Sequence, residues 1–288
     1  MQNVRSEPLI RITGLHHVYR EGTLRALDGI DLEIETGEYV ALVGANGSGK
    51  STLLMHLNAL LLPTGGDVMI DGMNTRDHRF LREIRSTVGM VFQSPDTQII
   101  ATIVEEDVAF GPENIGVPEQ KLRHRVDQAL REVGLIGLRK RPSHLLSAGQ
   151  KQLLAIASVL AMHPRCLVFD EATSMLDPAS RRRFLETLEH LHRQGLTLVC
   201  ATHNMDEASL AQRIIVLSKG KVVADGNPGA IFSRREMLAS TSIEPPSSLR
   251  LAEKIGEYLN GFHSSALTIT ELADDVDAYL RKKGRHEQ

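Results

Sequence analysis

Residues 44–51 constrain the fold of this chain more than any other part of the sequence. They read Gly-Ala-Asn-Gly-Ser-Gly-Lys-Ser and fit the pattern GxxxxGK[ST], which is typical of a phosphate-binding loop, or P-loop. The apolar residues 38–43 before it predict a buried strand, and residues 51–62 after it predict a helix that Pro63 closes. The alternative is a glycine-rich turn that binds no ligand. The P-loop is favoured because it requires a strand before the turn and a helix after it, and both are predicted here.

The residue types in this loop suit a phosphate chain. Several backbone N–H groups must converge on the phosphates, so side chains have to be absent where Gly44, Gly47 and Gly49 stand. The helix that begins near Lys50 adds the positive end of its dipole. We expect Lys50 to reach the β- and γ-phosphates and the Ser51 hydroxyl to ligate Mg²⁺. The other loop residues expected at the nucleotide are Asn46, Ser48 and Thr52.

A second acidic motif follows about 120 residues later. Residues 167–171, Leu-Val-Phe-Asp-Glu, predict an apolar strand that ends in two carboxylates, which is the Walker B arrangement. Asp170 is placed to hold Mg²⁺ through its water shell, and Glu171 to polarise an attacking water as a general base. Solvated acids at an ordinary strand end are common, but the pairing with the P-loop favours the catalytic interpretation.

The remaining pattern predicts an α/β protein with a helical tail. Strands are predicted over 87–93, 167–169 and 196–201, and helices over 118–134, 150–162 and 178–194. Because strands and helices alternate, the sheet should be parallel. Residues 213–226 have the pattern of a β-hairpin. After a linker-like stretch, 240–248, two amphipathic segments predict an appended helical hairpin, whose second helix has the capping-box pair Thr268 and Glu271.

Composition excludes several classes of protein. The chain has 288 residues, 42% of them hydrophobic, and a net charge of −3, which argues against a disordered chain and against a broadly basic nucleic-acid binder. Its 2 cysteines cannot form a disulfide framework, so we expect a reducing compartment. The longest apolar run has about ten residues, whereas a membrane helix needs about 20. Residues 1–8 lack the apolar core of a signal peptide, so we expect any membrane span to belong to another chain.

Further motifs resemble those of the ATP-binding cassette (ABC) ATPases over residues 10–232. Residues 146–150, Leu-Ser-Ala-Gly-Gln, resemble the LSGGQ signature and lie about 20 residues before Asp170. Gln93 stands in the position of the Q-loop, residues 174–177 match the D-loop, and His203 matches the switch histidine at the end of a strand. Tyr19 stands where the family stacks an aromatic ring on adenine, although it could simply pack on the sheet.

The resemblance implies a fold and its domains. We expect an ABC ATPase domain over residues 8–235, built from a RecA-like parallel core, an antiparallel β subdomain and a helical subdomain over about 94–160. A C-terminal helical extension would occupy residues 240–288.

The resemblance also implies a site for ATP and Mg²⁺. Glu171, His203 and Gln93 would be catalytic, while Ser51, Gln93 and Asp170 would hold the metal. Gln93 could instead be a solvated loop residue. The residues implied to contact the nucleotide from the signature and the D-loop are Ser147, Gly149, Gln150 and Asp177.

Two residues depart from the family pattern. Ala148 stands where the signature commonly has Gly, and its methyl group should be tolerated if the position needs no positive φ. Leu153 stands where an Arg is usual, so a partner for that Arg should be absent or paired otherwise.

Residues 91–98, 102–112 and 171–178 resemble the energy-coupling factor (ECF) transporter ATPases, which include cobalt and nickel importers. That resemblance implies an importer subunit, peripheral at the cytoplasmic face of the membrane, with a transmembrane coupling subunit and a small substrate-binding membrane protein as partners. Two ATPase chains, identical or paralogous, would meet head to tail around ATP. The tail would hold this pair together or only pack on its own domain.

The solute stays open between a transition-metal ion and a vitamin. A non-transport ABC ATPase acting on nucleic acid and a regulatory cassette are the alternatives. The net charge and the intact Lys50, Asp170, Glu171 and His203 argue against them.

Overall fold

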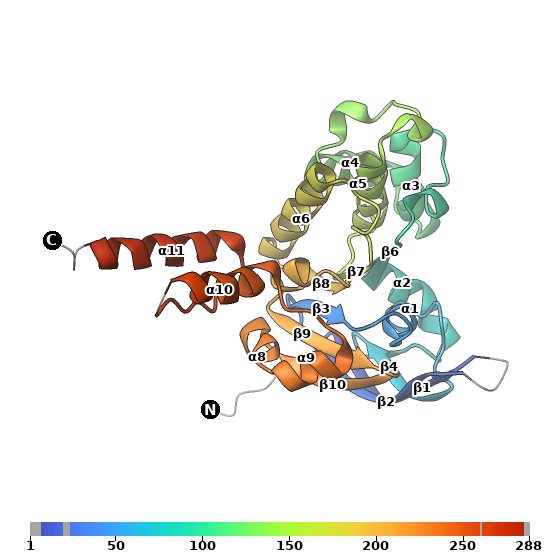
Figure 1. Cartoon of the computed structure of the whole chain (residues 1–288). Coiled ribbons are helices and arrows are strands. Elements are labelled where there is room, and N and C mark those ends of the chain that lie inside the picture. Colours follow the sequence, from blue (N-terminus) through green and yellow to red (C-terminus); the bar gives the residue numbers. More distant parts are fainter. Residues whose placement is uncertain (1–6, 20–23, 260, 285–288) are drawn as a thin grey trace, which may run out of the picture.

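The computed structural model describes residues 7–19, 24–259 and 261–284. Two sheets and a helical lobe form the body of the molecule, and two C-terminal helices extend from its side (Figure 1). Residues 1–6 of the N-terminal segment and residues 260 and 285–288 of the expected extension lie outside the described residues.

The central sheet has six strands in the order β10-β9-β3-β8-β7-β6. All neighbours are parallel except β9 and β10, which form the expected hairpin. The strands are β3 (Tyr39–Val43), β6 (Val88–Val91), β7 (Cys166–Asp170), β8 (Thr197–Ala201), β9 (Arg213–Ser218) and β10 (Lys221–Gly226). Nearly every residue of the four inner parallel strands is buried, as expected of a parallel sheet covered on both faces. The predicted parallel core is confirmed.

A second, antiparallel sheet has the order β2-β1-β4-β5. Its strands are β1 (Ile10–Val18), β2 (Arg25–Ile34), β4 (Gly65–Ile70) and β5 (Met73–Asn74). Inward-facing residues of this sheet share one apolar cluster with α1 (Lys50–Leu57) and with the face of the central sheet that is turned towards it. The antiparallel subdomain is confirmed, and the P-loop helix α1 lies between the two sheets.

The helical lobe stands over the sheets (Figure 1). Its helices are α3 (Val104–Asn114), α4 (Glu119–Glu132) and α5 (Ala148–Leu160). Helix α2 (Leu81–Thr87) leads into β6, and α6 (Pro178–Arg193) packs between α5 and β8. Short 3₁₀ turns at His78–Phe80, Pro95–Thr97, Ile136–Leu138 and Ser143–Leu145 connect these elements.

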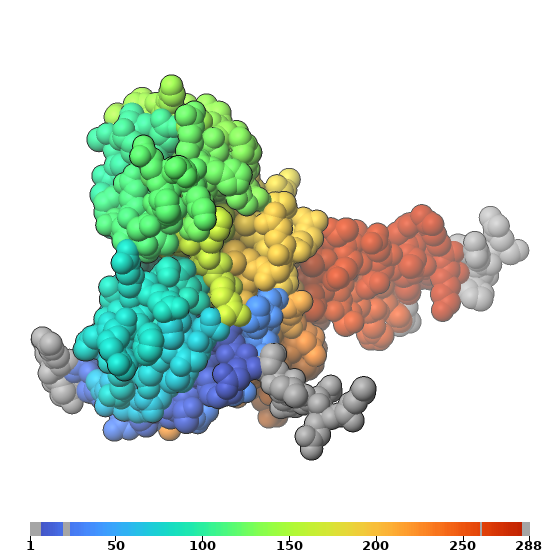
Figure 2. All heavy atoms as spheres, turned by 180° about the vertical axis from the view of Figure 1, so that it is seen from behind, coloured from blue at the N-terminus to red at the C-terminus, as the bar shows by residue number. Residues whose placement is uncertain are grey.

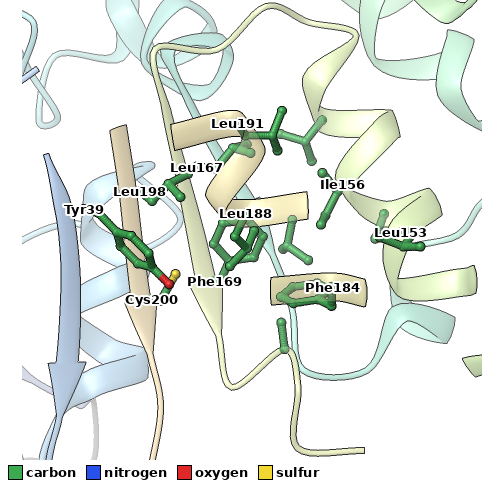
Figure 3. Packing of buried hydrophobic residues seen from close by; sticks show 14 of the residues in the cluster. Tyr39, Leu153, Ile156, Leu167, Phe169, Phe184, Leu188, Leu191, Leu198 and Cys200 are labelled. Carbon is green, nitrogen blue, oxygen red and sulfur yellow. The ribbon is translucent and has the colours of Figure 1, made fainter. Parts of the chain in front are cut away.

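The main core lies between the central sheet and helices α5 and α6 (Figure 3). Phe169 of β7 meets Phe184 of α6 edge to face, with ring centroids 5.7 Å apart. Leu153 of α5 is 2% exposed and belongs to the same cluster, where Figure 3 labels it. Each such side chain contributes about 1.5–3 kcal/mol by burial. The lobe is therefore fastened to the strand that carries Asp170.

The C-terminal helices leave the body of the molecule, as Figure 2 shows from behind. The elements after β8 other than the hairpin are α7 (Met205–Ala208), α8 (Pro228–Phe232), α9 (Arg235–Thr241), α10 (Ser247–Tyr258) and α11 (Ile269–Gly284). Helices α10 and α11 share a small apolar cluster around Phe262 and Leu272. The predicted capping pair forms in both directions: Glu271 N–H donates to Thr268 Oγ1 at 3.2 Å, and Thr268 N–H donates to Glu271 Oε2 at 3.1 Å.

Some predicted element bounds were wrong. The helix over 51–62 ends at Leu57, because Ala59 takes a left-handed conformation with φ of 55° and the N–H groups of Leu60 and Leu61 both turn back to Met55 O. The strand over 87–93 ends at Val91. The linker-like stretch 240–248 is helical at both ends, because α9 runs to Thr241 and α10 begins at Ser247.

The domain boundary between 235 and 240 falls inside α9, so the division into residues 8–235 and 240–288 stays a prediction. None of the helices in the described part of the chain is both long and apolar enough to cross a bilayer.

Candidate functional site

The P-loop connects the carboxyl end of β3 to α1, and its backbone needs glycine. Gly44, Gly47 and Gly49 have φ values of 153°, 78° and 109°, which side-chain-bearing residues rarely adopt. A Cβ atom on Gly44 would lie 2.2 Å from Leu217 O, and one on Gly49 would lie 2.7 Å from Ala26 O. A Cβ atom on Gly47 would meet nothing within 4 Å. Gly44 and Gly49 are thus held by packing, while Gly47 faces open space.

Lys50 is buried at the start of α1. Its side chain is 5% exposed, and its Nζ donates to Gly44 O at 2.8 Å and to Ala45 O at 3.4 Å. The helix has no side-chain cap at Gly49 and no acidic residue in its first turn. Its first N–H groups and the ammonium therefore form a positive cradle that suits an anion. In the same loop, Ser48 Oγ is buried and without a hydrogen-bond partner. Asn46 is exposed at the cradle's rim.

Ser51 meets the end of β7. Its Oγ donates to Asp170 Oδ1 at 2.9 Å, so the two predicted metal ligands are in contact. Burial, assisted by the charge of Glu171, raises the pKa of Asp170, against the lowering effects of Ser51 and Lys50. Two hard oxygen donors side by side fit Mg²⁺, which prefers carboxylate and hydroxyl ligands.

Glu171 lies between two cationic or ionisable partners. Its Oε1 is 3.6 Å from Lys50 Nζ, and its Oε2 is 3.6 Å from His203 Nδ1. Its φ of 47° is left-handed, and its N–H donates to Ala201 O at 3.0 Å. The carboxylate is thereby aimed across the end of the sheet, beside the P-loop and the loop after β8. The structure brings Lys50, Asp170, Glu171 and His203 together.

Gln93 contacts the segment that follows Glu171. Strand β6 ends at Val91, and Gln93 Nε2 donates to Ser174 Oγ at 3.0 Å. The amide nitrogen thus binds the segment after Glu171, and the predicted role as metal ligand would belong to Oε1 of the same amide. The main chain next to it is fixed, because Gln152 Nε2 of α5 donates to Phe92 O at 2.9 Å. Gln93 therefore lies where the helical lobe joins the sheet.

Tyr19 lies over the P-loop helix. Its hydroxyl is 3.0 Å from Thr52 Oγ1, and its ring meets His17 edge to face with centroids 4.7 Å apart. The residue is 39% exposed. The contact with Thr52 links the expected adenine position to the phosphate cradle. It also agrees with the alternative that Tyr19 packs on the body of the molecule.

The signature residues begin helix α5. Ser147 and Gln150 form a reciprocal capping box: Gln150 N–H donates to Ser147 Oγ, and Ser147 N–H donates to Gln150 Oε1. A Cβ atom on Gly149 would lie 2.5 Å from Ser180 Oγ of α6, so this position excludes a larger residue. Ala148 has no positive φ and is exposed, which explains why its methyl group is tolerated.

Asp177 of the D-loop caps α6. Its Oδ1 accepts hydrogen bonds from the N–H groups of Ala179 and Ser180 at 3.0 and 3.1 Å. The bond to Ser180 is the main reason why its pKa lies below the ordinary value. In the single chain this carboxylate has a structural role as an N-cap.

An open cavity of about 610 Å³ lies beside the predicted catalytic residues Glu171 and His203. Its walls include Gly44, Ala45 and Asn46 of the P-loop together with Glu171 and His203. Among the described residues that line it, none belongs to the signature at 146–150. One chain therefore assembles the phosphate cradle and the acidic groups but leaves its own signature elsewhere.

Sequence reasoning missed Glu207, a buried carboxylate on α7 that is 7% exposed. Its Oε2 accepts hydrogen bonds from Thr173 Oγ1 at 2.8 Å and Thr202 Oγ1 at 2.9 Å. Its Oε1 is 3.4 Å from Arg181 Nε. The carboxylate thus joins the segment after Glu171, the loop of His203 and α6. The available signal was a glutamate next to apolar Ala208, four residues after the predicted switch histidine His203.

Comparisons with known proteins give one answer. The family model described as ABC transporter matches residues 27–174. The ECF transporter ATP-binding protein EcfA1 of Clostridioides difficile is 46% identical over 90% of this chain and 94% of its own length. The cobalt import ATP-binding protein CbiO of Syntrophus aciditrophicus is 42% identical, over 94% of this chain and 97% of its own.

Solved structures agree with these relatives. The structure of cbiO1 from Clostridium perfringens, described as part of the ABC transporter complex cbiONQ, matches with a TM-score of 0.75 and 36% identity, covering 88% of this chain and 99% of that one. A dimer of the ATP-binding cassette MJ0796, in a post-hydrolysis state bound to ADP and Pi, matches with a TM-score of 0.68 and 30% identity, covering 76% and 98%. The chain belongs to the ABC transporter ATPase family and, within it, to the energy-coupling factor transporter ATP-binding proteins.

Proposed function

We propose that this chain is the ATP-hydrolysing subunit of an ECF-type importer of a small solute. One observation carries the proposal: Lys50, Ser51, Asp170, Glu171 and His203 meet at one end of the parallel strands of the central sheet. That arrangement supplies a phosphate cradle, a metal-binding pair and a general base within contact of one another. The likeness to importer ATPases over most of the chain supports the same function.

ATP would bind with its phosphates on the P-loop. The uncapped start of α1 offers N–H groups to the phosphate oxygens, and Lys50 would exchange its carbonyl partners for the β- and γ-phosphates. Tyr19, which is 39% exposed, would stack its ring on adenine. Because Gly47 has no neighbour within 4 Å of a Cβ position, the backbone there can approach the phosphates closely.

Ser51 and Asp170 would hold Mg²⁺. When bound, Mg²⁺ supplies positive charge to the phosphate oxygens. The Ser51 hydroxyl already points to Asp170 Oδ1, so the donors need little movement. Gln93 would join them through its Oε1, while its Nε2 donates to Ser174 Oγ.

Glu171 would accept a proton from water while the water oxygen forms its bond to the γ-phosphorus. The bond from that phosphorus to the bridging oxygen breaks, and ADP leaves with the electron pair. His203, 3.6 Å from Glu171, would orient the carboxylate and the γ-phosphate. Lys50 Nζ lies on the other side of the carboxylate, 3.6 Å from Glu171 Oε1.

A second ATPase chain would complete the site. The signature at the start of α5 does not line the cavity beside Glu171 and His203. The signature of the second chain would therefore contact the nucleotide bound there. The dimeric cassette among the solved relatives supports this arrangement. ATP would then favour the closed pair because it makes contacts there that the separated chains lack.

The membrane partners would be a coupling subunit, contacted by the segment after Gln93, and a small substrate-binding protein. The chain would lie peripherally at the cytoplasmic face of the membrane and would not bind nucleic acid. The transported solute would be a transition-metal ion or a vitamin, selected by the membrane proteins.

Affinity purification of the tagged chain from detergent-solubilised membranes tests this function. We expect at least one integral membrane protein to co-purify in fixed ratio with two ATPase chains. Recovery of the chain from the soluble fraction only, without any membrane protein, would contradict the importer role.

A further inference from the structure

A polar contact joins the C-terminal extension to the loop of the switch histidine. Ser247, the first residue of α10, donates its N–H to Asp206 Oδ1 and its Oγ to Asp206 Oδ2, both at 2.7 Å. The two residues are 41 positions apart, and we call their contact the clasp. The Asp206 carboxylate also lies at the amino end of a helix of 12 residues, where the helix dipole favours a negative charge.

The clasp continues to the backbone on both sides of His203. Asp206 N–H donates to Asn204 Oδ1 at 2.9 Å, and Asn204 N–H donates to Thr202 Oγ1 at 3.0 Å. His203 stands between Asn204 and Thr202, and its own side chain is 60% exposed. Its position is therefore set by the backbone hydrogen bonds of its neighbours rather than by packing around the ring.

The segment that leads to the clasp lines the catalytic cavity. Residues 242–247 and Arg250 face the same space of about 610 Å³ as Glu171 and His203. Pro245 and Pro246 restrict the backbone just before the clasp, and Pro246 has φ of −53° and ψ of 153°. A stiff segment of this kind passes a displacement of α10 on to α7 instead of absorbing it.

We propose that Asp206 is a positioning residue for ATP hydrolysis and that the clasp couples the C-terminal helices to His203. The inference rests on the proposed function, and it assigns the extension an effect on the chemical step in addition to any effect on assembly. Movement of α10, for example when a second chain contacts the extension, would move the His203 loop and change turnover.

The test compares four substitutions in the full-length chain. Ser247→Pro removes both donors at once, and the first position of a helix after an extended residue accepts proline. Ser247→Ala removes only the hydroxyl, and Asp206→Ala removes the acceptor. Glu253→Gln is the control, because Glu253 joins α10 to α9 through an exposed ion pair with Arg235 and lies outside the cavity.

We expect Ser247→Pro and Asp206→Ala each to lower kcat for ATP hydrolysis about tenfold, since small displacements of catalytic groups are costly. The KM for ATP should stay within about twofold, because the P-loop is unchanged. Ser247→Ala should be intermediate and Glu253→Gln like the wild type. The double variant Asp206→Ala, Ser247→Pro should lose no more than either single variant, because both remove the same contact.

Wild-type kcat in Ser247→Pro would overturn the proposal, as would an equal loss in Glu253→Gln. ATP-dependent dimerisation, measured in a Glu171→Gln background, should be unaffected by Ser247→Pro. If it falls in step with kcat, the clasp serves assembly and the inference is wrong. Failure of the proposed function is a separate result, because the wild type would then hydrolyse no ATP or would be recovered without any membrane protein.

Discussion

Glu171 illustrates how single residues are held at this site. Its left-handed backbone costs about 1–3 kcal/mol for a residue with a side chain. The hydrogen bond from its N–H to Ala201 O fixes that conformation, and Lys50 and His203 lie on either side of its carboxylate. The strain is kept because the direction of the carboxylate depends on it.

The P-loop glycines give a matched pair for testing packing against ligand access. Gly44→Ala should lower the free energy of unfolding by roughly 3 kcal/mol, because its Cβ would lie 2.2 Å from Leu217 O. Gly47→Ala should lower it by only about 1 kcal/mol, the cost of positive φ, yet weaken ATP binding at least about tenfold. Urea unfolding and ATP titration measure the two effects, and equal stability losses would contradict the geometry.

At the scale of elements, the strands and helices next to the motifs could be predicted from the sequence. Buried β3, β7 and β8 are short apolar runs, and α5 and α6 have clear caps or boundaries. Strand β1 could not be assigned from its residues, because its alternation of apolar and polar side chains breaks at irregular pairings near Gly14. The antiparallel sheet was reached through family resemblance only.

Prediction of the site from the sequence had the same limits as prediction of the elements. The P-loop and Walker B positions followed from residue type and order. The contacts of Gln93 with Ser174 and of Asp206 with Ser247 did not, because each joins polar residues that are distant in sequence and carry no pattern of their own.

His56 of the P-loop helix α1 should make the free energy of unfolding depend on pH. Burial lowers the pKa of His56 to about 4, against the opposing effect of its bond to Thr52 O, whereas the ordinary value is 6.5. Between pH 6.5 and pH 4 the unfolded chain binds a proton at His56 that the folded chain does not bind. The contribution of neutral His56 to the free energy of unfolding is therefore fully present above pH 6.5 and is lost as the pH falls towards 4.

His56→Leu should remove this part of the pH dependence. From pH 7 to pH 5 the wild type should lose about 2 kcal/mol more free energy of unfolding than the variant. Denaturant unfolding at the two pH values measures it. The same loss in both proteins would show that His56 does not titrate as its burial requires.

For the whole molecule, the exposed surface after Gln93 is the place to test docking to a membrane partner. Ile100 is 65% exposed beside the lobe, and Val223 is 45% exposed on β10. Ile100→Asp should abolish co-purification with membrane proteins while ATP binding stays, because a charge would have to be desolvated in the interface. Val223→Asp is the control and should co-purify normally. Loss of co-purification in both variants, or in neither, would contradict the proposal that this surface docks to a membrane partner.

At the scale of the whole assembly, the proposed activity is ATP hydrolysis by Glu171 at a site shared between two chains. Glu171→Gln keeps the shape of the side chain but removes the base, so ATP turnover should fall at least about hundredfold. ATP affinity should stay within a few-fold, and the variant with ATP should become a stable dimer by light scattering. Turnover like that of the wild type would contradict the role of Glu171, and a variant that stays monomeric with saturating ATP would contradict the shared site.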